Sequence, residues 1–293
     1  MKPFAIACTL LLLVLVSCIP DPVPITVPQA EARLVVASQM LPGNFVLVNV
    51  SRSFGALEYD PDQTDTLGDD LLARILVDSA RVVLAWPGGT DTLLPLGAGS
   101  YLSLGHQVQG NQTYELHVFD SLTGQEVRAA TVVLPQVPLG ELSYRFEYVR
   151  SNILDTFFTD TLLHLDVQFE DPAGANYYML NAYRFSLPDS NSLSRIFTGG
   201  SGIPTTIISD QILGGPRYRD TLTYNQFRPG DTLAVALSNI DRGYYEYLAT
   251  RERSGTSLFA ILLREPVNFP SNVVGGYGYF TLQLPSLNLI LLE

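Results

Sequence analysis

Short segments in which apolar and polar residues alternate run through most of the chain, and turn residues separate them about every ten positions. Alternation with a period of two predicts half-buried β-strands, and a series of short strands with regular turns is typical of a β-sandwich. The strands predicted in the first half are 33–38, 45–51, 80–86, 92–96, 101–104, 113–119 and 127–134. Those predicted in the second half are 144–149, 162–170, 177–186, 221–227, 232–238, 277–284 and 287–292, with a long polar loop over 187–204.

One segment breaks this period and predicts a helix from Asp241 to about Arg253, ended by Ser254-Gly255. It follows Ser238-Asn239-Ile240-Asp241, a Ser-x-x-Asp pattern that supplies N-cap chemistry. One face of this helix carries Tyr244, Tyr247, Leu248 and Arg251. We expect that face to pack on the second sandwich and Tyr245 to point elsewhere.

Two proline-rich stretches divide the chain. Residues 19–30 contain four prolines, which predicts a stiff, extended tether. The stretch 135–138, Pro-Gln-Val-Pro, is typical of a linker. The pattern therefore predicts an all-β protein with a β-sandwich over 31–138 and a second, β-rich, sandwich-like domain over 139–293 that holds one short helix near 241–253.

The first eighteen residues predict a cleaved signal. Lys2 precedes an almost unbroken apolar run over 4–16, which is shorter than the roughly 20 residues that a membrane-spanning helix needs. The run ends in Leu15-Val16-Ser17-Cys18, which resembles the lipobox of bacterial lipoproteins, where the cysteine is acylated. We therefore expect a signal peptide over 1–17, lipidation of Cys18, a tether over 18–30 and attachment to the cell envelope.

Composition and charge narrow the function classes. Hydrophobic residues make up 46% of the 293 residues and charged residues 16%, which is typical of a folded protein. The net charge of −12 argues against nucleic acid as a partner and against adsorption to anionic lipid, so membrane attachment has to come from the acyl chains on Cys18. Lys2 is the only lysine, which excludes lysine chemistry in the mature chain.

Few residues point to catalysis or metal binding. The acidic loop over 58–70 holds the weak metal candidates Asp60, Asp62 and Asp65, but the EF-hand pattern is absent and a solvated loop is the better interpretation. The three histidines, His106, His117 and His164, form no ligand pair in sequence. The loop Gly199-Gly200-Ser201-Gly202 does not join a strand to a helix, which argues against a phosphate site. We expect no cofactor and no enzymatic activity.

The tripeptide Asp-Thr-Leu recurs along the chain. One interpretation is structural, since Asp favours turns and Thr favours the strand that follows. The other is that the tripeptide resembles the Asp-Ser/Thr-apolar sequon for O-glycosylation in bacteria that carry large uptake systems. The candidate sites are Thr66, Thr92, Thr161, Thr221 and Thr232.

An ordered set of motifs covers nearly the whole mature chain: the lipobox at Cys18, Ala32-Arg33-Leu34-Val35-Val36, Asp171-Pro172-Ala173-Gly174-Ala175-Asn176-Tyr177-Tyr178, Gly230-Asp231-Thr232-Leu233, the helix signature 238–248, Pro266-Val267-Asn268-Phe269-Pro270-Ser271-Asn272-Val273 and Gly275-Gly276-Tyr277-Gly278-Tyr279-Phe280. In this set the chain resembles the bacterial outer-membrane lipoproteins of domain-of-unknown-function family 4249. The resemblance implies an immunoglobulin-like first sandwich, a β-rich second domain with one helix, and residence with TonB-dependent transporters. The family has no established activity, so no catalytic residue is carried over.

One departure from the family pattern is the apolar tail 285–293, which is either an extra strand or a partner contact.

Three functions remain open. The preferred one is a non-catalytic, lipid-anchored outer-membrane lipoprotein that serves as an accessory subunit of a TonB-dependent transporter or another surface complex, with the cell surface favoured over the periplasmic face. The alternative is a surface glycan- or peptide-binding module. The candidate contact residues, for a ligand or a partner, are Tyr245, Tyr277 and Tyr279. The third is a hydrolase, which needs a carboxylate pair or a histidine–carboxylate pair in one cleft.

Overall fold

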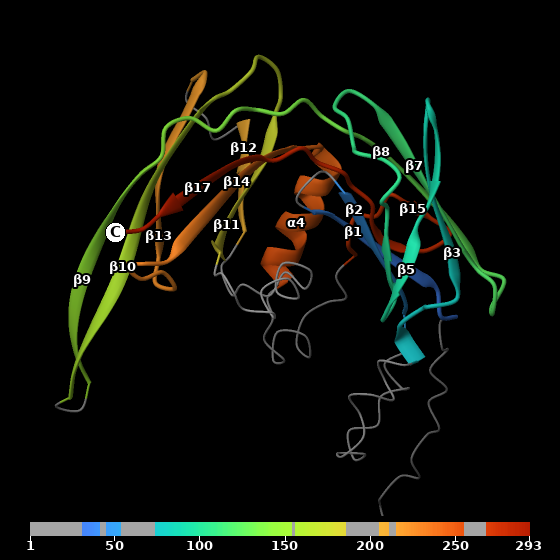
Figure 1. Ribbon diagram of the computed structural model, residues 1–293, viewed down its shortest axis with the longest axis horizontal. Helices are drawn as coiled ribbons and strands as arrows, with labels where there is room; N and C mark the ends of the chain where they lie inside the picture. Colours follow the sequence, from blue (N-terminus) through green and yellow to red (C-terminus); the bar gives the residue numbers. More distant parts are fainter. Residues whose placement is uncertain are drawn as a thin grey trace, which may run out of the picture. The chain divides into compact units, whose positions relative to one another are not determined.

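The computed structural model describes residues 31–41, 45–53, 74–153, 156–185, 205–210, 215–254 and 268–293 (Figure 1). The predicted signal peptide, Cys18, the tether, the acidic loop over 58–70 and the loop over 187–204 lie outside these ranges. Among the described residues, no helix is both long and apolar enough to cross a membrane.

The first sandwich consists of two five-stranded sheets, with the strand orders β16-β1-β2-β6-β5 and β15-β8-β7-β3-β4. Its strands are β1 (Leu34–Leu41), β2 (Phe45–Arg52), β3 (Ala80–Trp86), β4 (Gly89–Thr92), β5 (Leu94–Gly97), β6 (Ser100–Leu102), β7 (Thr113–Asp120), β8 (Glu126–Val132), β15 (Val273–Val274) and β16 (Tyr277–Tyr279). Every second residue of β8 is buried, as the sequence alternation predicts.

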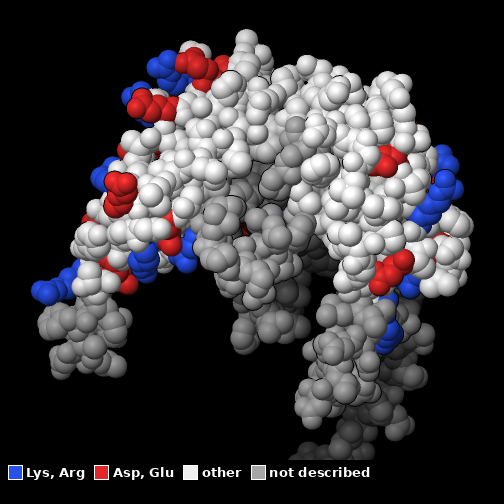
Figure 2. Space-filling model, viewed as in Figure 1, with Lys and Arg blue, Asp and Glu red and all other residues white. Residues whose placement is uncertain are grey.

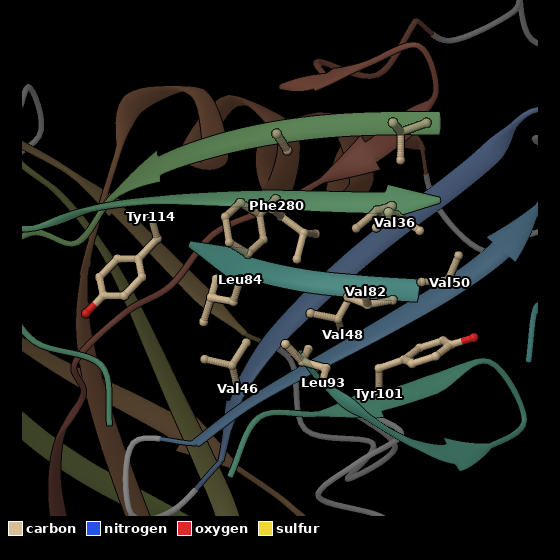
Figure 3. Close-up of a cluster of buried hydrophobic side chains, with 14 of the residues drawn as sticks. Val36, Val46, Val48, Val50, Val82, Leu84, Leu93, Tyr101, Tyr114 and Phe280 are labelled. Atoms are coloured by element: carbon tan, nitrogen blue, oxygen red, sulfur yellow. The ribbon is translucent and has the colours of Figure 1, made fainter. Parts of the chain in front are cut away.

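The core of this sandwich lies between its two sheets and is built mainly of valine and leucine (Figure 3). Val36, Val46 and Val48 from one sheet meet Val82 and Leu84 from the other, and all five side chains are fully buried. Each such side chain contributes roughly 1.5–3 kcal/mol when it leaves water, so burial alone can account for a stable sandwich without disulfides.

The chain returns to this first sandwich near its C-terminus. β16 pairs in parallel with β1, β15 pairs antiparallel with β8, and Phe280 is fully buried among the residues of Figure 3. The predicted domain boundary, which places all of 139–293 in the second domain, is therefore wrong for this segment. Alternation identifies a strand but says nothing about which sheet it joins. Gly278, at φ 101°, allows β16 to lie close to β1, because a Cβ at position 278 would overlap the Val36 carbonyl oxygen.

The second sandwich pairs a three-stranded sheet, β13-β10-β9, with a four-stranded sheet, β12-β11-β14-β17. Its elements are β9 (Ser143–Ile153), β10 (Thr156–Glu170), β11 (Tyr177–Phe185), β12 (Thr206–Ser209), β13 (Arg217–Tyr224), β14 (Thr232–Ile240), β17 (Ser286–Leu291) and the helix α4 (Arg242–Ser254). Leu163 and Leu165 from β10 face Leu233, Val235 and Leu237 from β14 across a second, separate core.

The structure confirms the predicted fold class, an all-β chain of sandwich architecture. Among the described residues, the order of elements contains one complete short helix, α4. Two short strands, β12 and β15, were not predicted. The predicted strand 92–96 is split at Leu93 between β4 and β5, and only 277–279 of the predicted strand 277–284 forms a ladder. These errors concern short strands, in which few residues alternate.

A buried carboxylate organises one end of the first sandwich. Asp120 ends β7 and is fully buried. It accepts hydrogen bonds from the hydroxyls of Ser79 and Thr123 and pairs with the guanidinium of Arg52 at 2.5 Å. Burial alone would raise the pKa of Asp120, but the hydrogen bonds from Thr123, Ser79 and Arg52 hold it well below its usual range.

We predict that Asp120→Asn lowers the free energy of unfolding by about 3 kcal/mol, because it leaves Arg52 without its charged partner. Since the folded-state pKa is depressed, the stabilisation is present above the unfolded-state pKa of about 4 and is lost as pH falls below it. Urea unfolding of the wild type should therefore weaken more between pH 5 and pH 2 than that of the variant. Glu115→Gln, at an exposed carboxylate, is the matched control; equal pH slopes in wild type and Asp120→Asn would contradict the assignment.

Candidate interaction site at helix α4

The start of α4 is set by Asp241, which follows directly after β14. Its Oδ1 accepts a hydrogen bond from the backbone N–H of Tyr244 at 3.0 Å, so Asp241 is the N-cap residue. The predicted cap from Ser238 is wrong, because β14 continues to Ile240 and Ser238 is buried within it. Arg251 and Arg253 lie in the last turn, where positive charge is favourable for the helix dipole.

The same carboxylate connects α4 to strand β16. Oδ1 of Asp241 also accepts the hydroxyl hydrogen of Tyr279, at 2.8 Å. Burial, followed by the nearby Asp241, raises the pKa of Tyr279, so the hydroxyl remains a donor at neutral pH. Gly243 makes this approach possible, since a Cβ at position 243 would overlap the Tyr279 hydroxyl.

Aromatic rings pack around this hydrogen bond. Tyr244 lies 5.3 Å from Tyr279 and 6.0 Å from Tyr247, measured between ring centroids. Tyr247 also contacts Phe269, at 5.9 Å. On the other side of the helix, Tyr245 lies 4.9 Å from Tyr177. Such tilted and offset pairs each contribute about 0.5–1.5 kcal/mol beyond simple burial, so the rings are held in fixed positions.

The helix packs through Leu248 on the outer face of the four-stranded sheet, as predicted. Leu248 is buried against Met179 and Ile240, with Tyr177 and Ile207 beside them. Tyr245, expected to point elsewhere, packs on Tyr177 of the same sheet, so that part of the prediction is wrong. Tyr244 and Tyr247 also contact Tyr279 of β16.

Partly exposed rings lie on both sides of the helix, Tyr177 and Tyr245 on one side and Tyr247 and Phe269 on the other. We call these four rings together the α4 aromatic surface. Rigid aromatic side chains of this kind dominate the energetics of protein interfaces.

The three predicted contact tyrosines differ in accessibility. Tyr277 is 45% exposed, and the Arg33 guanidinium lies 5.8 Å from its ring centroid. Tyr245 is half-buried against Tyr177. Tyr279 is only 8% exposed, so its assignment as a contact residue is wrong. Of the two tyrosines of β16, only Tyr279 contacts the tyrosines of α4 among the ring pairs described.

The turn motif 171–178 is also structural. The amide of Asn176 donates to the carbonyl oxygen of Pro172 at 2.6 Å, and the hydroxyl of Tyr178 donates to the carboxylate of Asp171. These bonds hold the turn between β10 and β11. The motif therefore maintains the fold.

The histidines have different environments. His106 stacks on Trp86 with 3.8 Å between ring centroids, and burial lowers its pKa. His117 is exposed beside Glu115. His164 lies between Glu147, at 2.7 Å from Nε2, and the hydroxyl of Thr223, at 3.1 Å from Nδ1. His164 thus forms the histidine–carboxylate pair that a hydrolase would need.

The geometry around His164 does not otherwise suit acyl transfer. The three groups lie in the interior of adjacent strands, β9, β10 and β13, rather than on a sharp turn that exposes a nucleophile. β10 is paired on both sides, so its backbone N–H groups are consumed by the ladders and cannot stabilise an oxyanion. We interpret the three groups as a cross-strand hydrogen-bonded row.

The outer face of the three-stranded sheet is polar and carries charges of both signs, which gather on the side of β9 and β10 in Figure 2. A depression of about 600 Å³ on this sheet is lined by Asp166, Arg219 and Thr221, among others. Asp166 accepts hydrogen bonds from Thr221 at 2.6 Å and Ser143 at 3.1 Å, and the bond from Thr221 lowers its pKa. Its carboxylate is therefore already satisfied, and the described residues contain no cluster of three metal-ligand side chains.

The candidate glycosylation sites also separate by burial. Thr92 and Thr221 are exposed, and Thr232 is partly exposed. Thr161 is 8% exposed within β10, so its hydroxyl cannot be reached in the folded protein. Thr66 and the metal candidates Asp60, Asp62 and Asp65 lie outside the described residues.

These features define an all-β protein of two sandwiches with an aromatic surface around a single capped helix. The chain belongs to the family described as Domain of unknown function (DUF4249), whose model matches residues 20–284. No curated protein matches the sequence. Among solved structures, the FN1–FN3 domains of chicken CNTN1 are similar over 73% of this chain at 8% identity, with a TM-score of 0.21; the match spans 60% of that chain's length.

Gly243→Ala should destabilise the protein even though alanine favours helices by about 1 kcal/mol over glycine, because the new methyl group overlaps the Tyr279 hydroxyl. Tyr279→Phe removes that hydroxyl and should restore most of the loss. A double-mutant cycle from chemical unfolding should give a coupling of about 1 kcal/mol or more. Additive effects of the two substitutions would show that the two positions do not touch.

If the Asp-Thr-Leu tripeptides are glycosylated, modification should follow accessibility. Intact-mass analysis of protein purified from a glycosylating envelope host should show the loss of one glycan in Thr92→Ala and in Thr221→Ala. Thr161→Ala should leave the mass of the attached glycan unchanged. A glycan on Thr161 would contradict this expectation, and the absence of a glycan on every site would reject the sequon interpretation itself.

Proposed function

We propose that this protein is a non-catalytic lipoprotein of the outer membrane, anchored by acyl chains on Cys18, and that it acts as an accessory subunit of a TonB-dependent transporter or another surface complex. The cell-surface face is the favoured location. Attachment by lipid fits the net charge of −12, which disfavours adsorption to anionic headgroups.

The observation that carries the proposal is the α4 aromatic surface. Its partly exposed rings are held in two pairs, Tyr177 with Tyr245 and Tyr247 with Phe269, on the two sides of the capped helix. A rigid aromatic surface loses little side-chain entropy when a partner covers it, which is the property of interface hot spots.

A glycan- or peptide-binding module is the second candidate. Its supporting observation is Tyr277, whose exposed ring could stack on a sugar. A binding groove lined by tyrosines would favour this function more strongly. The depression on the three-stranded sheet is lined by neither Tyr245 nor Tyr277, so the accessory-subunit function is preferred.

The test is a purification of the tagged full-length protein from gently solubilised outer membranes, with mass spectrometry of the co-purifying proteins. We expect a β-barrel partner in stoichiometric amount. The double variant Tyr245→Ala/Phe269→Ala should recover at least about tenfold less partner, since truncating hot-spot residues costs about 2 kcal/mol or more.

Two controls accompany this experiment. Tyr148→Ala removes an exposed tyrosine on β9, away from the α4 aromatic surface, and should leave the recovery unchanged. Cys18→Ala removes the acylated residue and should release the protein from the membrane fraction. Recovery of the lipoprotein alone would reject the accessory role, and full recovery with the double variant would reject the α4 aromatic surface as its interface.

A further inference from the structure

Strand β17 forms an edge of its sheet. Within the described part of the chain it is hydrogen-bonded to β14 on one side only. The Leu292 N–H donates to the Asp231 carbonyl, whereas the Leu291 carbonyl accepts from Tyr144 on the opposite side. Backbone direction alternates along an antiparallel strand, so the N–H and C=O groups of Leu287 and Leu289 also point away from β14.

The side chains of these residues are exposed as well. Leu287, Leu289 and Leu291 are 51%, 59% and 58% exposed, and all three lie on one face of β17. The strand, Ser-Leu-Asn-Leu-Ile-Leu, has no charge, proline or glycine. Edge strands of soluble proteins are ordinarily blocked by such residues, and an unblocked apolar edge is typical of a surface that another strand covers.

A groove of about 480 Å³ runs beside this edge, within the roughly 300–1,000 Å³ of ligand clefts. Its walls are Asn288–Ile290 on one side and Gly140–Tyr144 on the other. Leu142, Tyr144 and Ile290 border the second core and are only partly buried. A segment placed beside β17 would therefore meet apolar side chains on both of its faces.

Both ends of the edge are closed by the protein itself. At one end the Leu139 N–H donates to the Ser286 hydroxyl, and the Gln136 amide donates to the Pro285 carbonyl. At the other end Tyr144 donates to the Leu291 carbonyl and accepts from the Glu293 N–H. The open stretch is thus limited to the groups of Leu287 and Leu289, which suits one short extended segment better than the full-length pairing of two copies of β17.

We propose that β17 is the docking site for an extended segment of another protein, which adds as a fifth strand to the sheet β12-β11-β14-β17. The segment should be apolar on both faces. It should carry a flanking lysine or arginine, because Glu141 is the only charged residue among the described ones that line the groove and Glu293 lies at its end. The inference rests on the proposed function, since it identifies a second surface of this accessory subunit, besides the α4 aromatic surface, at which a partner would bind.

The experiment places the photo-crosslinking residue p-benzoylphenylalanine at position 289 of the full lipoprotein in its native outer membrane. Position 122 is the control, because Leu122 is also exposed, at 78%, but lies in the turn after β7. We expect a crosslink from position 289, and none from 122, to an apolar segment of a different protein. Amide hydrogen exchange at Leu287 and Leu289 should slow at least tenfold in the purified complex relative to the free protein.

Two variants separate the contribution of the apolar side chains of β17 from that of its outward-pointing backbone N–H groups. Leu289→Lys places a charge on the apolar face, and Leu289→Pro removes an N–H that points away from β14 and so leaves that ladder intact. Each should reduce crosslinking from position 287 at least tenfold, while Leu122→Lys should not. If Leu289→Pro unfolds, Leu289→Lys still tests the site, because the exposed side chain is not part of the core.

The outcomes distinguish this inference from the proposed function. A β-barrel partner that co-purifies while positions 287 and 289 give no crosslink would overturn the β17 site and leave the accessory role standing. Crosslinks between two copies of this chain would identify a homodimer edge and overturn the proposed occupant. The absence of both partner and crosslink would reject the two proposals together.

Discussion

The parallel pairing of β16 with β1 is the constraint on which the rest of the structure depends. It draws residues 273–282 out of the C-terminal part of the chain and into the first sandwich, so that the chain passes from β14 through α4 to the first sandwich and back to β17. The two cores are therefore linked by more than the linker at 135–138. The first sandwich cannot complete its sheets until nearly the whole chain is available, which implies slow folding dominated by contacts distant in sequence.

Around α4, the carboxylate of Asp241 has two structural roles. Asp241 caps the helix and binds the Tyr279 hydroxyl, so the helix start, strand β16 and the surrounding rings form one unit. Asp120 has a comparable role at the end of β7, where it joins two hydroxyls and a guanidinium. In both places a buried or half-buried carboxylate is satisfied by several donors, which is the condition under which such a group stabilises a fold.

Much of the fold could be predicted from the sequence, because alternation in β7 and β8 is regular and the helix after Asp241 has a different period. The pairing of strands could not be predicted, because alternation does not encode which sheet a strand joins. For this reason the predicted strand 277–284 was placed in the wrong domain. The burial of Tyr279 was missed for the same reason: it depends on a helix that packs from elsewhere. The pairing of His164 with Glu147 and Thr223 had no signal in sequence spacing, because the three residues meet only through register.

The contact between Gly243 and Tyr279 has a consequence for how this family varies. The two positions are far apart in sequence, yet the space that a side chain at 243 would need is filled by the hydroxyl at 279. Among relatives, a residue larger than glycine at the second helical position should occur only together with a shorter residue in place of the tyrosine. Correlated substitution at this pair would mark the relatives that keep the crossover of the chain between its two sandwiches.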